Sequence, residues 1–455
     1  MTWTMRGEEA VHDAVLPPGP ALPRAVVGLA ILASRRRTLR WLRNRYGPAF
    51  STNIPIFGPS VVISDPALVR QLFMTSPEVA GTVQPNLGQV LGRNSFFNLD
   101  GKAHLRQRKL LVPPFHGKRM QGYEAIIEEE TLLEAATWPL GQEIQTLPPM
   151  MRITLNAILR AVFGAEGAEF DSLRVLLPKL VELGSRLMFV PTPRLGYQRW
   201  TPWGRFAGYR REFDAILQTL IDKARSDPGL AEREDVLAIM LRSTYDDGQS
   251  MTTEEIADQL LTMLAAGHET TATTLAWAIE RLRRHPDILT RLVAEVDAGG
   301  SELRQATILE VQRNRSVIDL TARSVLAPSM RLGEWSIPQG YTVMVGIDLV
   351  HHDDSIFPNA AVFDPDRFLG THPDTYAWVP FGGGTRRCIG AAFANMEMNV
   401  VLRTLLREFE LIPSGEPDER WHSRGVAFAP AKGGRAVVRR RATTQNGVTP
   451  NSSVT

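Results

Sequence analysis

Phe381-Gly382-Gly383-Gly384-Thr385-Arg386-Arg387-Cys388-Ile389-Gly390 contains the only cysteine of the 455-residue chain. The glycines permit a tight turn and a close approach of backbone to a flat ligand. The residues after Gly390 are good helix formers, so we expect Cys388 just before a helix N-terminus. There the helix dipole, Arg386 and Arg387 would lower the thiol pKa and favour a metal-binding or nucleophilic thiolate. A buried structural cysteine is the alternative, although it would not require three glycines and two arginines.

The bulk composition excludes several classes of protein. Lys+Arg number 51 and Asp+Glu 49, which leaves a formal net charge of +2 and argues against a nucleic-acid binder. One cysteine cannot build an internal disulfide framework, a four-cysteine zinc site or a cysteine-ligated iron–sulfur cluster. If Cys388 binds a metal, the other ligands come from elsewhere, and a haem macrocycle meets that requirement.

No segment of the sequence reads as a membrane span or a leader peptide. The apolar run Val26–Ala33 is far shorter than the roughly 20 residues that cross a bilayer. It also lacks a preceding basic region and a cleavage site. We therefore expect a soluble, cytoplasmic protein without a stable membrane anchor.

The order of elements predicts a mainly α chain with a smaller β region. We expect an irregular arm over residues 1–24, a single domain over 25–442 and a disordered tail over 443–455. The domain should open with a basic, amphipathic helix over 25–45. Further helices are expected over 66–73, 103–111, 117–137, 148–163, 169–189, 204–227, 231–243, 288–297 and 303–313. Strands are expected over 49–54, 60–63, 316–325, 331–337, 341–347 and 427–440, with a hairpin turn at Pro338-Gln339-Gly340.

The longest helix should run from Thr252 to about His285, a length of about 50 Å. Thr252 and Glu255 match a capping box, and Pro286 marks the end. Its middle, Leu260–Thr274, is apolar on most faces and should be buried.

Within this helix lies Gly267-His268-Glu269-Thr270. A carboxylate and hydroxyls inside an apolar helix are costly unless they have partners. Threonines bonded to their own helix carbonyls, with Glu269 in a salt bridge, would satisfy them structurally. Gly267 favours a functional interpretation, because a mid-helix glycine costs about 1 kcal/mol against alanine and usually marks a close approach. A glycine, an acid and an alcohol together suit a site where a diatomic ligand and protons reach a metal.

Two charged patterns are weaker signals by themselves. Glu310 and Arg313 are three apart, and hence on one helix face. His104 and Arg108 are four apart, and together with Arg323 they could bind carboxylates, although a solvated basic face is the alternative.

Taken together, these residues resemble the cytochrome P-450 family of haem-thiolate monooxygenases, over about residues 40–440. Phe381, Gly384, Arg386, Cys388 and Gly390 match the Phe-x-x-Gly-x-Arg-x-Cys-x-Gly signature, which is highly specific. Residues 266–270 resemble the oxygen-activation motif. Glu310 and Arg313 match a Glu-x-x-Arg pair, which Arg367 would complete as a buried triad. The chain is most similar to soluble actinobacterial members of mycobacterial type, notably through residues 113–117 and 381–392.

The resemblance implies a haem b between the long helix and the Cys388 loop, and insertion of one oxygen atom from O2 into an apolar substrate. Cys388 would be the axial ligand of the iron, Thr270 would hydrogen-bond dioxygen and Glu269 would relay protons. The remaining cofactor-binding residues implied are His104, Arg108, Arg323 and Arg386 at the propionates, with Phe381 and Gly267 against the macrocycle.

It also implies partners. A separate ferredoxin and ferredoxin reductase would supply electrons, with an acidic ferredoxin facing Arg106, Lys109, Lys118 and Arg387. The substrate pocket would comprise loops 80–98 and 185–205 and the segment 316–321, and its substrate could be a lipid, terpenoid or polyketide. Pro191–Trp203 is either an aromatic lid over this pocket or a packed connector.

The chain departs from the family pattern in three ways. The link between Asp297 and Glu310 is short, and Asn314-Arg315-Ser316 replaces the usual prolines. Asp319 places a carboxylate in a segment that usually faces substrate, where it would orient a polar group or form a salt bridge with a nearby arginine.

Two rival functions remain open. One is a haem-thiolate isomerase, dehydratase or peroxygenase, which would not need the Glu269–Thr270 pair. The other is a non-enzymatic haem-thiolate sensor. A cysteine hydrolase is excluded, because no His or Asn lies in a recognisable catalytic context.

Overall fold

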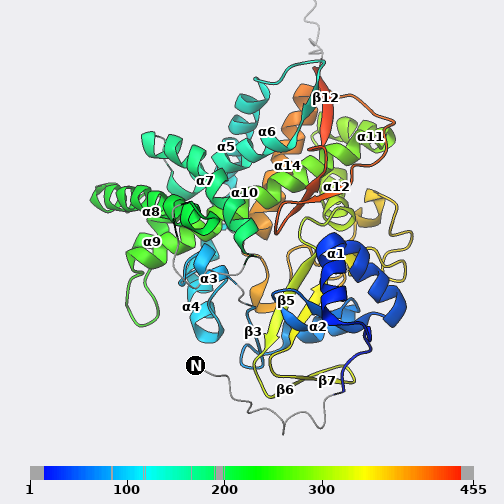
Figure 1. Cartoon of the computed structure of the whole chain (residues 1–455). Coiled ribbons are helices and arrows are strands. Elements are labelled where there is room, and N and C mark those ends of the chain that lie inside the picture. Colours follow the sequence, from blue (N-terminus) through cyan, green and yellow to red (C-terminus); the bar gives the residue numbers. More distant parts are fainter. Residues whose placement is uncertain are drawn as a thin grey trace, which may run out of the picture.

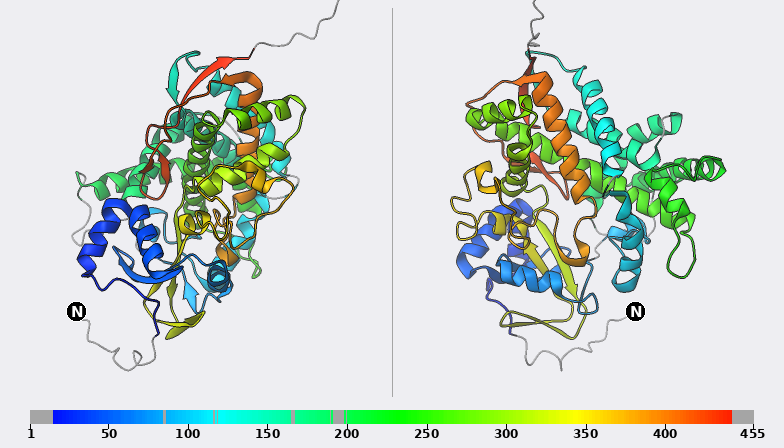
Figure 2. Two further views of the ribbon diagram at one scale, coloured as in Figure 1. Left: turned by 90° about the vertical axis from the view of Figure 1, so that its right-hand side faces the viewer. Right: turned by 180° about the vertical axis from the view of Figure 1, so that it is seen from behind.

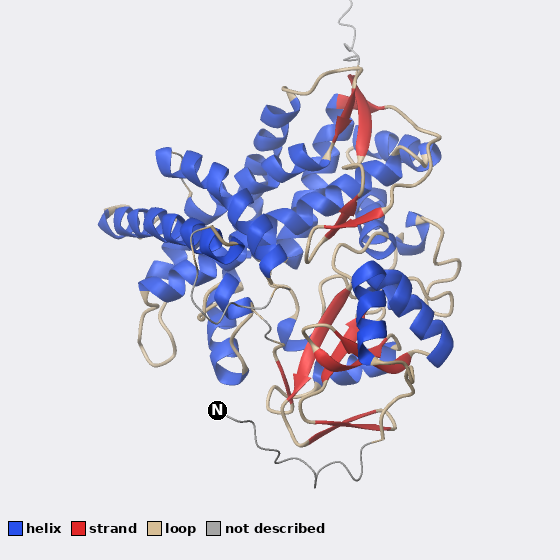
Figure 3. Ribbon diagram, in the orientation of Figure 1, coloured by secondary structure: helices blue, strands red, loops and turns tan. Residues whose placement is uncertain are grey.

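The computed structural model describes residues 15–83, 86–115, 117, 119–164, 167–188, 190, 198 and 200–441. Helices form the larger part of the molecule, and most of the strands gather in a smaller part beside it (Figures 1 and 3). The expected mainly α architecture with a smaller β region is therefore confirmed.

The central element is α10, Thr253–Leu282. The Thr252 hydroxyl accepts a hydrogen bond from the Glu255 N–H, and the Glu255 carboxylate accepts one from the Thr252 N–H, as the capping-box pattern predicts. Pro286 opens α11, Pro286–Asp297, so the end of α10 also falls close to its predicted place. α6, α12 and α14 pack around α10 (Figure 1).

Most helices on the N-terminal side of α10 begin and end within two residues of their predicted positions, but α9 begins five residues late and α3 lies in a segment predicted as a loop. α2 opens at a proline after Asp65, whose side chain accepts the N–H groups of Ala67 and Leu68. The bounds are α1 Arg24–Tyr46, α2 Pro66–Met74, α3 Leu87–Val90, α4 Gly101–Leu111, α5 Arg119–Ala135, α6 Leu147–Phe163, α7 Ala168–Leu187, α8 Pro202–Ser226 and α9 Val236–Arg242. The helices after α11 are α12 Glu302–Asn314, α13 Ile347–His351 and α14 Ala391–Glu408.

Five strands form the main sheet, in the order β1-β2-β8-β5-β3. β1 (Ala49–Ile54) and β2 (Gly58–Ile63) form an antiparallel hairpin. β8 (Thr342–Gly346) runs parallel to β2 and antiparallel to β5 (Leu320–Val325). β3 (Ala80–Gly81) closes the edge.

Three smaller sheets complete the fold. β10 (Trp421–Ser423) pairs with β11 (Phe428–Pro430), and the turn between them carries Arg424. The three-stranded sheet comprises β4 Glu143–Gln145, β12 Arg435–Arg440 and β9 Phe409–Leu411.

The strands predicted over 331–337 and 341–347 do not pair with each other across Pro338-Gln339-Gly340. The first of these segments is itself a hairpin, β6 (Ser329–Leu332) with β7 (Trp335–Pro338), and it turns at Gly333, whose φ is +60°. Pro338-Gln339-Gly340 instead connects β7 to β8, which belongs to another sheet. Alternating side chains reveal strands but not which strands are partners.

The chain ends were predicted as an arm and a tail. Residues 15–23 contain no helix or strand, yet they are tied down, because the Ser336 N–H donates to the Val15 carbonyl and the Ser51 N–H to the Pro18 carbonyl. Residues 1–14 and the predicted tail, 443–455, lie outside the described residues.

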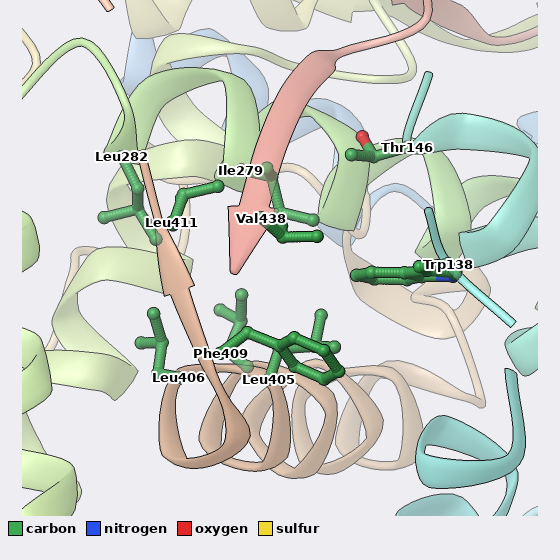
Figure 4. Close-up of a pocket in the computed structure, with 10 residues that line it drawn as sticks. Trp138, Thr146, Ile279, Leu282, Leu405, Leu406, Phe409, Leu411 and Val438 are labelled. Atoms are coloured by element: carbon green, nitrogen blue, oxygen red, sulfur yellow. The ribbon is translucent and has the colours of Figure 1, made fainter. Parts of the chain in front are cut away.

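The main hydrophobic core surrounds α10. At one end of the helix, apolar side chains from α10, α14, β9 and β12 converge around a small gap (Figure 4). None of the predicted site residues lines this gap, so we assign it to the core.

Candidate functional site

The Cys388 loop folds as the glycines predicted. Gly382 and Gly384 have φ of +63° and +64°, which a side chain would disfavour. A Cβ at Gly383 would lie 2.1 Å from the Phe73 ring, so this glycine is required by close packing. The Cys388 N–H donates to the Phe381 carbonyl at 3.0 Å, and α14 begins three residues later.

Cys388 is open to solvent along one side and closely surrounded by protein on the others. The residue is exposed, yet burial is the largest influence on its thiol and raises the pKa. A hydrogen bond from the Gly390 backbone and the charges of Arg108 and Arg387 act in the opposite direction. The expected net lowering of this pKa was therefore wrong for the thiol in this structure, because desolvation outweighs the positive charges.

α10 opens to the surface along a single turn. Between residues 258 and 282, every residue is buried except Ala265, Ala266, Gly267 and Thr270, and Ala266 is the exposed one among these four. The Thr270 hydroxyl donates to the Ala266 carbonyl at 2.8 Å, which is the back-bonded arrangement that the purely structural interpretation predicts. The open turn carries no bulky side chain, so it leaves room for a flat ligand to approach the helix.

Glu269 points away from this turn and is paired. Its Oε1 accepts a hydrogen bond from Nε of Arg424 at 2.9 Å, and the carboxylate is almost buried while the guanidinium is partly exposed. Nothing in the local sequence around Arg424 indicates this role. The partner was missed because the pair joins residues 155 positions apart.

Four cationic or imidazole side chains lie close enough to influence one another. His104 is buried, and desolvation with the charges of Arg386, Arg108 and Arg323 lowers its pKa to about 4, so the ring is neutral. Burial and the Arg386 charge lower the pKa of Arg323 to about 10. The structure therefore brings together the residues predicted to bind propionates.

Within the described part of the chain, His104, Arg108 and Arg323 form no ion pair with a carboxylate. Arg108 donates to the Arg387 carbonyl at 2.7 Å, and Arg323 to the Ala322 carbonyl at 2.8 Å. Arg386 differs, because it pairs with Asp100 and also donates to the carbonyl of Leu99. Asp100 is thus a further charged residue of the site that the sequence did not reveal.

These observations can be tested against the haem that the resemblance implies. A thiol accessible from one side could occupy an axial position. A helix turn without bulky side chains could face a planar ring. Arg108 and Arg323, without carboxylate partners among the described residues, could bind the propionates together with the neutral His104. The residues fit the group. Phe381 is half-buried beside Cys388, with its ring 5.9 Å from that of Trp378.

The predicted triad is formed and completely buried at its centre. Arg313 pairs with Glu310 through two hydrogen bonds of 2.7 Å, and Arg367 Nε lies 3.2 Å from the Glu310 carboxylate. Arg313 also donates to the carbonyls of His351, Ala360 and Val362 at 2.6–3.1 Å. It ties α12 to the segment leading toward the Cys388 loop.

The substrate-facing role considered for Asp319 is not supported. Arg35 of α1 binds both carboxylate oxygens, at 2.7 and 2.8 Å, and Asp319 is buried. The salt-bridge alternative is confirmed. The chain positions that carboxylate for packing against α1.

The loop ahead of α4 is fastened to the first half of α10. Asp258 accepts the N–H and side-chain amide of Asn94 and pairs with Arg210 of α8. Thr262 donates to the Ser95 hydroxyl at 2.8 Å. These contacts were not predicted, and they fix the loop whose Phe96 ring lies beside His104.

The other predicted regions are only partly described. Arg106 and Lys109 lie in exposed pairs with Asp247 and Asp246. Lys118 lies outside the described residues, as does most of the segment Pro191–Trp203. Trp203 itself is buried in the first turn of α8.

No helix among the described residues is both long enough and apolar enough to span a bilayer. In the same residues, no group of three or more His, Cys, Asp or Glu side chains could bind a metal ion.

Comparisons with known proteins agree with this geometry. The family model for cytochrome P450 matches residues 17–434. Cytochrome P450 138 of Mycobacterium tuberculosis is 58% identical over 94% of this chain and 97% of its own length. Cytochrome P450 135B1 of the same species is 38% identical over 93% of this chain and 91% of its own length.

Solved structures share the fold. A retinoic acid-bound cyanobacterial CYP120A1 superposes with a TM-score of 0.81 at 24% identity, over 94% of this chain and 100% of that one. The cytochrome P450DA haem domain superposes with a TM-score of 0.80 at 24% identity, over 95% of this chain and 99% of that one. With its Cys388 loop, its open turn of α10 and its buried Glu310–Arg313 pair, the chain belongs to the cytochrome P450 family.

Proposed function

We propose that the chain is a haem-dependent monooxygenase that inserts one atom of O2 into an apolar substrate. The observation that carries the proposal is the combination of an accessible Cys388 thiol, an open turn on α10 and two partly or largely desolvated arginines, Arg108 and Arg323, that have no carboxylate partner among the described residues. Each of these features is costly or purposeless for packing alone, and a haem accounts for all of them.

In this proposal Cys388 would bind the iron of haem b through its sulfur. The haem supplies the binding and activation of dioxygen, and a thiolate ligand favours cleavage of the O–O bond. Burial raises the pKa of the free thiol, and a hydrogen bond from the Gly390 backbone opposes that rise. Arg108 and Arg387 provide positive charge near the sulfur.

His104, Arg108, Arg323 and Arg386 would bind the propionates. His104 is neutral, so it can donate one hydrogen bond without adding charge, whereas Arg323 brings a cation that is already desolvated. A desolvated cation gains more from a carboxylate than a hydrated one. Phe381 and Gly267 would lie against the ring.

Thr270 and Glu269 are the proposed proton-handling pair. The Thr270 hydroxyl lies at the open turn of α10 and can exchange its bond to the Ala266 carbonyl for one to a ligand. Glu269 is one residue away and held by Arg424 on the side of the β10–β11 turn. In this proposal Glu269 would pass protons from solvent towards Thr270.

The substrate is proposed to be apolar, of lipid, terpenoid or polyketide type. Phe96 and Phe97 stack with centroids 4.5 Å apart in the loop beside His104, and the partly buried Leu87 lies nearby in sequence. Aromatic and aliphatic walls of this kind favour an apolar molecule.

The electron donor is proposed to be a separate ferredoxin with its reductase, in the cytoplasm. Arg387 is the exposed cation next to Cys388. Arg106 and Lys109 are occupied by aspartates in weak, exposed pairs, which an acidic partner could displace.

The test is turnover under 18O2 with a surrogate ferredoxin, its reductase and NADPH. Hits from a spectral titration of apolar compounds serve as substrates. The proposal is supported if the product contains one 18O atom and NADPH is consumed in proportion to the product formed. Product formed only with added peroxide indicates a peroxygenase. Binding without NADPH consumption indicates a sensor.

A further inference from the structure

The first half of α1 is apolar on all sides, although the described part of the chain covers only one of them. Val27 and Ile31 face the interior, whereas Val26, Leu29 and Leu32 are 50%, 67% and 71% exposed. This corrects the expectation of an ordinary amphipathic helix. The three exposed residues follow one another at intervals of three, so they are neighbours along the surface. A helix that is apolar all round normally has both sides covered.

α1 also bends, and residues on both sides of the bend extend the apolar surface. Ser34 has non-helical angles, so the two halves of the helix meet at an elbow. The hollow inside the elbow is lined by Val26 and Ala30 from the first half and by Arg37 and Trp41 from the second. Trp41 is 54% exposed. α1 lies on the outside of the molecule in Figure 1 and in the left view of Figure 2.

The neighbouring β1–β2 turn adds a second apolar element. Gly28 brings α1 against Pro55 of this turn, where a Cβ would lie 3.4 Å from the proline ring. Ile56, next in the turn, has φ of +75° and is 44% exposed. A β-branched residue is strained in that region, and glycine or asparagine would adopt it more easily. An exposed, strained isoleucine points to a purpose outside the folded chain.

The charged residues of α1 are all positive. α1 contains seven arginines and no Asp or Glu. Arg35, Arg36, Arg40 and Arg43 pair with Asp319, Asp348 and Asp353 on its inner side. Arg24, Arg37 and Arg45 are exposed, and none of them forms an ion pair within the described ranges. The inner pairs fix the second half of α1, and burial of Val27 and Ile31 fixes the first half, so Val26, Leu29 and Leu32 remain on the outer side.

We propose that α1 and the β1–β2 turn form a docking surface for anionic phospholipid membranes. Exposed Leu, Val, Ile and Trp side chains flanked by arginines match the composition of helices that lie in the membrane interface. Tryptophan favours the headgroup level, and arginines attract anionic lipid. A second copy of the chain fits less well, because a two-fold contact would bring the unpaired arginines of both copies together.

The proposal can be tested with the haem-loaded protein, independently of any monooxygenase activity. Co-sedimentation is measured with vesicles of phosphatidylcholine alone and with vesicles containing one anionic phosphatidylglycerol for every two phosphatidylcholines. We expect binding to the anionic vesicles that weakens as salt is raised. The double variant L29E/L32E should bind about tenfold more weakly.

Matched controls carry the same change elsewhere. Leu133 and Val175 are 59% and 60% exposed on α5 and α7, so L133E/V175E should bind like the unaltered protein. Brominated acyl chains should quench fluorescence in the unaltered protein more than in W41F. Equal haem absorption and circular dichroism show that each variant is folded.

Three outcomes would overturn the proposal. The first is no binding to anionic vesicles, and the second is equal binding by L29E/L32E. The third is a concentration-dependent dimer that L29E/L32E abolishes, which would assign the surface to a second copy of the chain. Failure of any of these tests leaves the proposed oxygen chemistry unaffected, because no step depends on α1.

Discussion

Arg424 in the turn between β10 and β11 binds Glu269 of α10, with 2.9 Å between Nε and Oε1. The same turn is fastened to α7, because the Ser185 hydroxyl accepts the Val426 N–H and donates to the Arg424 carbonyl. The β10–β11 turn therefore links α7 to the Glu269 carboxylate of α10. The position of the carboxylate proposed to handle protons depends on that turn.

Replacing Arg424 should disturb proton delivery. Without the guanidinium, Glu269 loses the contact that positions it. More of the electrons from NADPH should then reduce O2 to peroxide or water instead of forming product. We expect R424Q to lower the product formed per NADPH severalfold and to change the solvent isotope effect on NADPH consumption. R424K should restore part of the coupling. R420Q alters an exposed arginine just before β10 and should behave like the unaltered protein. Unchanged coupling in R424Q would show that the pair is only structural.

Replacing Arg323 should weaken haem binding without weakening the fold. Its guanidinium is buried, and desolvation lowers its pKa to about 10 without an ion-paired carboxylate among the described residues. R323M should leave the apoprotein as stable as before or slightly more stable, because a poorly compensated charge is removed. The same variant should lose haem to apomyoglobin at least several times faster, because one propionate contact is gone. R331M, at an exposed position on β6, is the control. An apoprotein strongly destabilised by R323M would contradict this account.

Replacing Arg313, unlike Arg323, should strongly destabilise the fold. It is fully buried, pairs with Glu310 and donates to three carbonyls, so its removal leaves one buried charge and several unsatisfied acceptors. We expect R313M to lose about 3–5 kcal/mol of unfolding free energy, or to fail to fold. R291M removes an exposed pair with Asp366 and should cost less than about 1 kcal/mol. Urea denaturation measures both, and similar losses in the two variants would refute the assignment.

His351 predicts how stability depends on pH. It is completely buried, the Val379 N–H donates to its Nε2, and burial lowers its pKa to about 3 from 6.5. Because the folded-state pKa is the lower one, the unfolded chain binds the proton first as pH falls. The stability that comes from keeping His351 neutral is fully present above about pH 6.5 and is lost progressively towards pH 3. By pH 4.5 the loss in unfolding free energy should be about 3 kcal/mol.

The check is a series of urea denaturations between pH 7 and pH 4.5. H351Q should be less stable at neutral pH but should show a shallower decline on acidification, because its side chain cannot be protonated. Parallel declines in the two proteins would show that His351 does not control this range.

The sequence was most informative where the signal is local. The capping box at Thr252 and Glu255, the proline after Asp65 and the glycines before Cys388 act through neighbours in the chain, so their elements were predicted closely. The pairing of Glu310 with Arg313 followed from helix spacing and the resemblance.

What could not be predicted depends on contacts between distant segments. No local pattern joins Arg424 to Glu269, Asp100 to Arg386 or Arg35 to Asp319. The net effect on the Cys388 thiol was also mispredicted, because burial is a property of the whole fold, whereas the helix dipole and adjacent arginines are visible in the sequence.

The central claim is that Cys388 is the haem ligand, and the absorption spectrum of the reduced, CO-bound protein tests it most directly. The unaltered protein should show the red-shifted Soret band of thiolate ligation. C388H should bind haem but shift that band to the position of imidazole ligation, with unchanged circular dichroism. A thiolate-type band that persists in C388H, or one that never appears in the unaltered protein, would contradict the account.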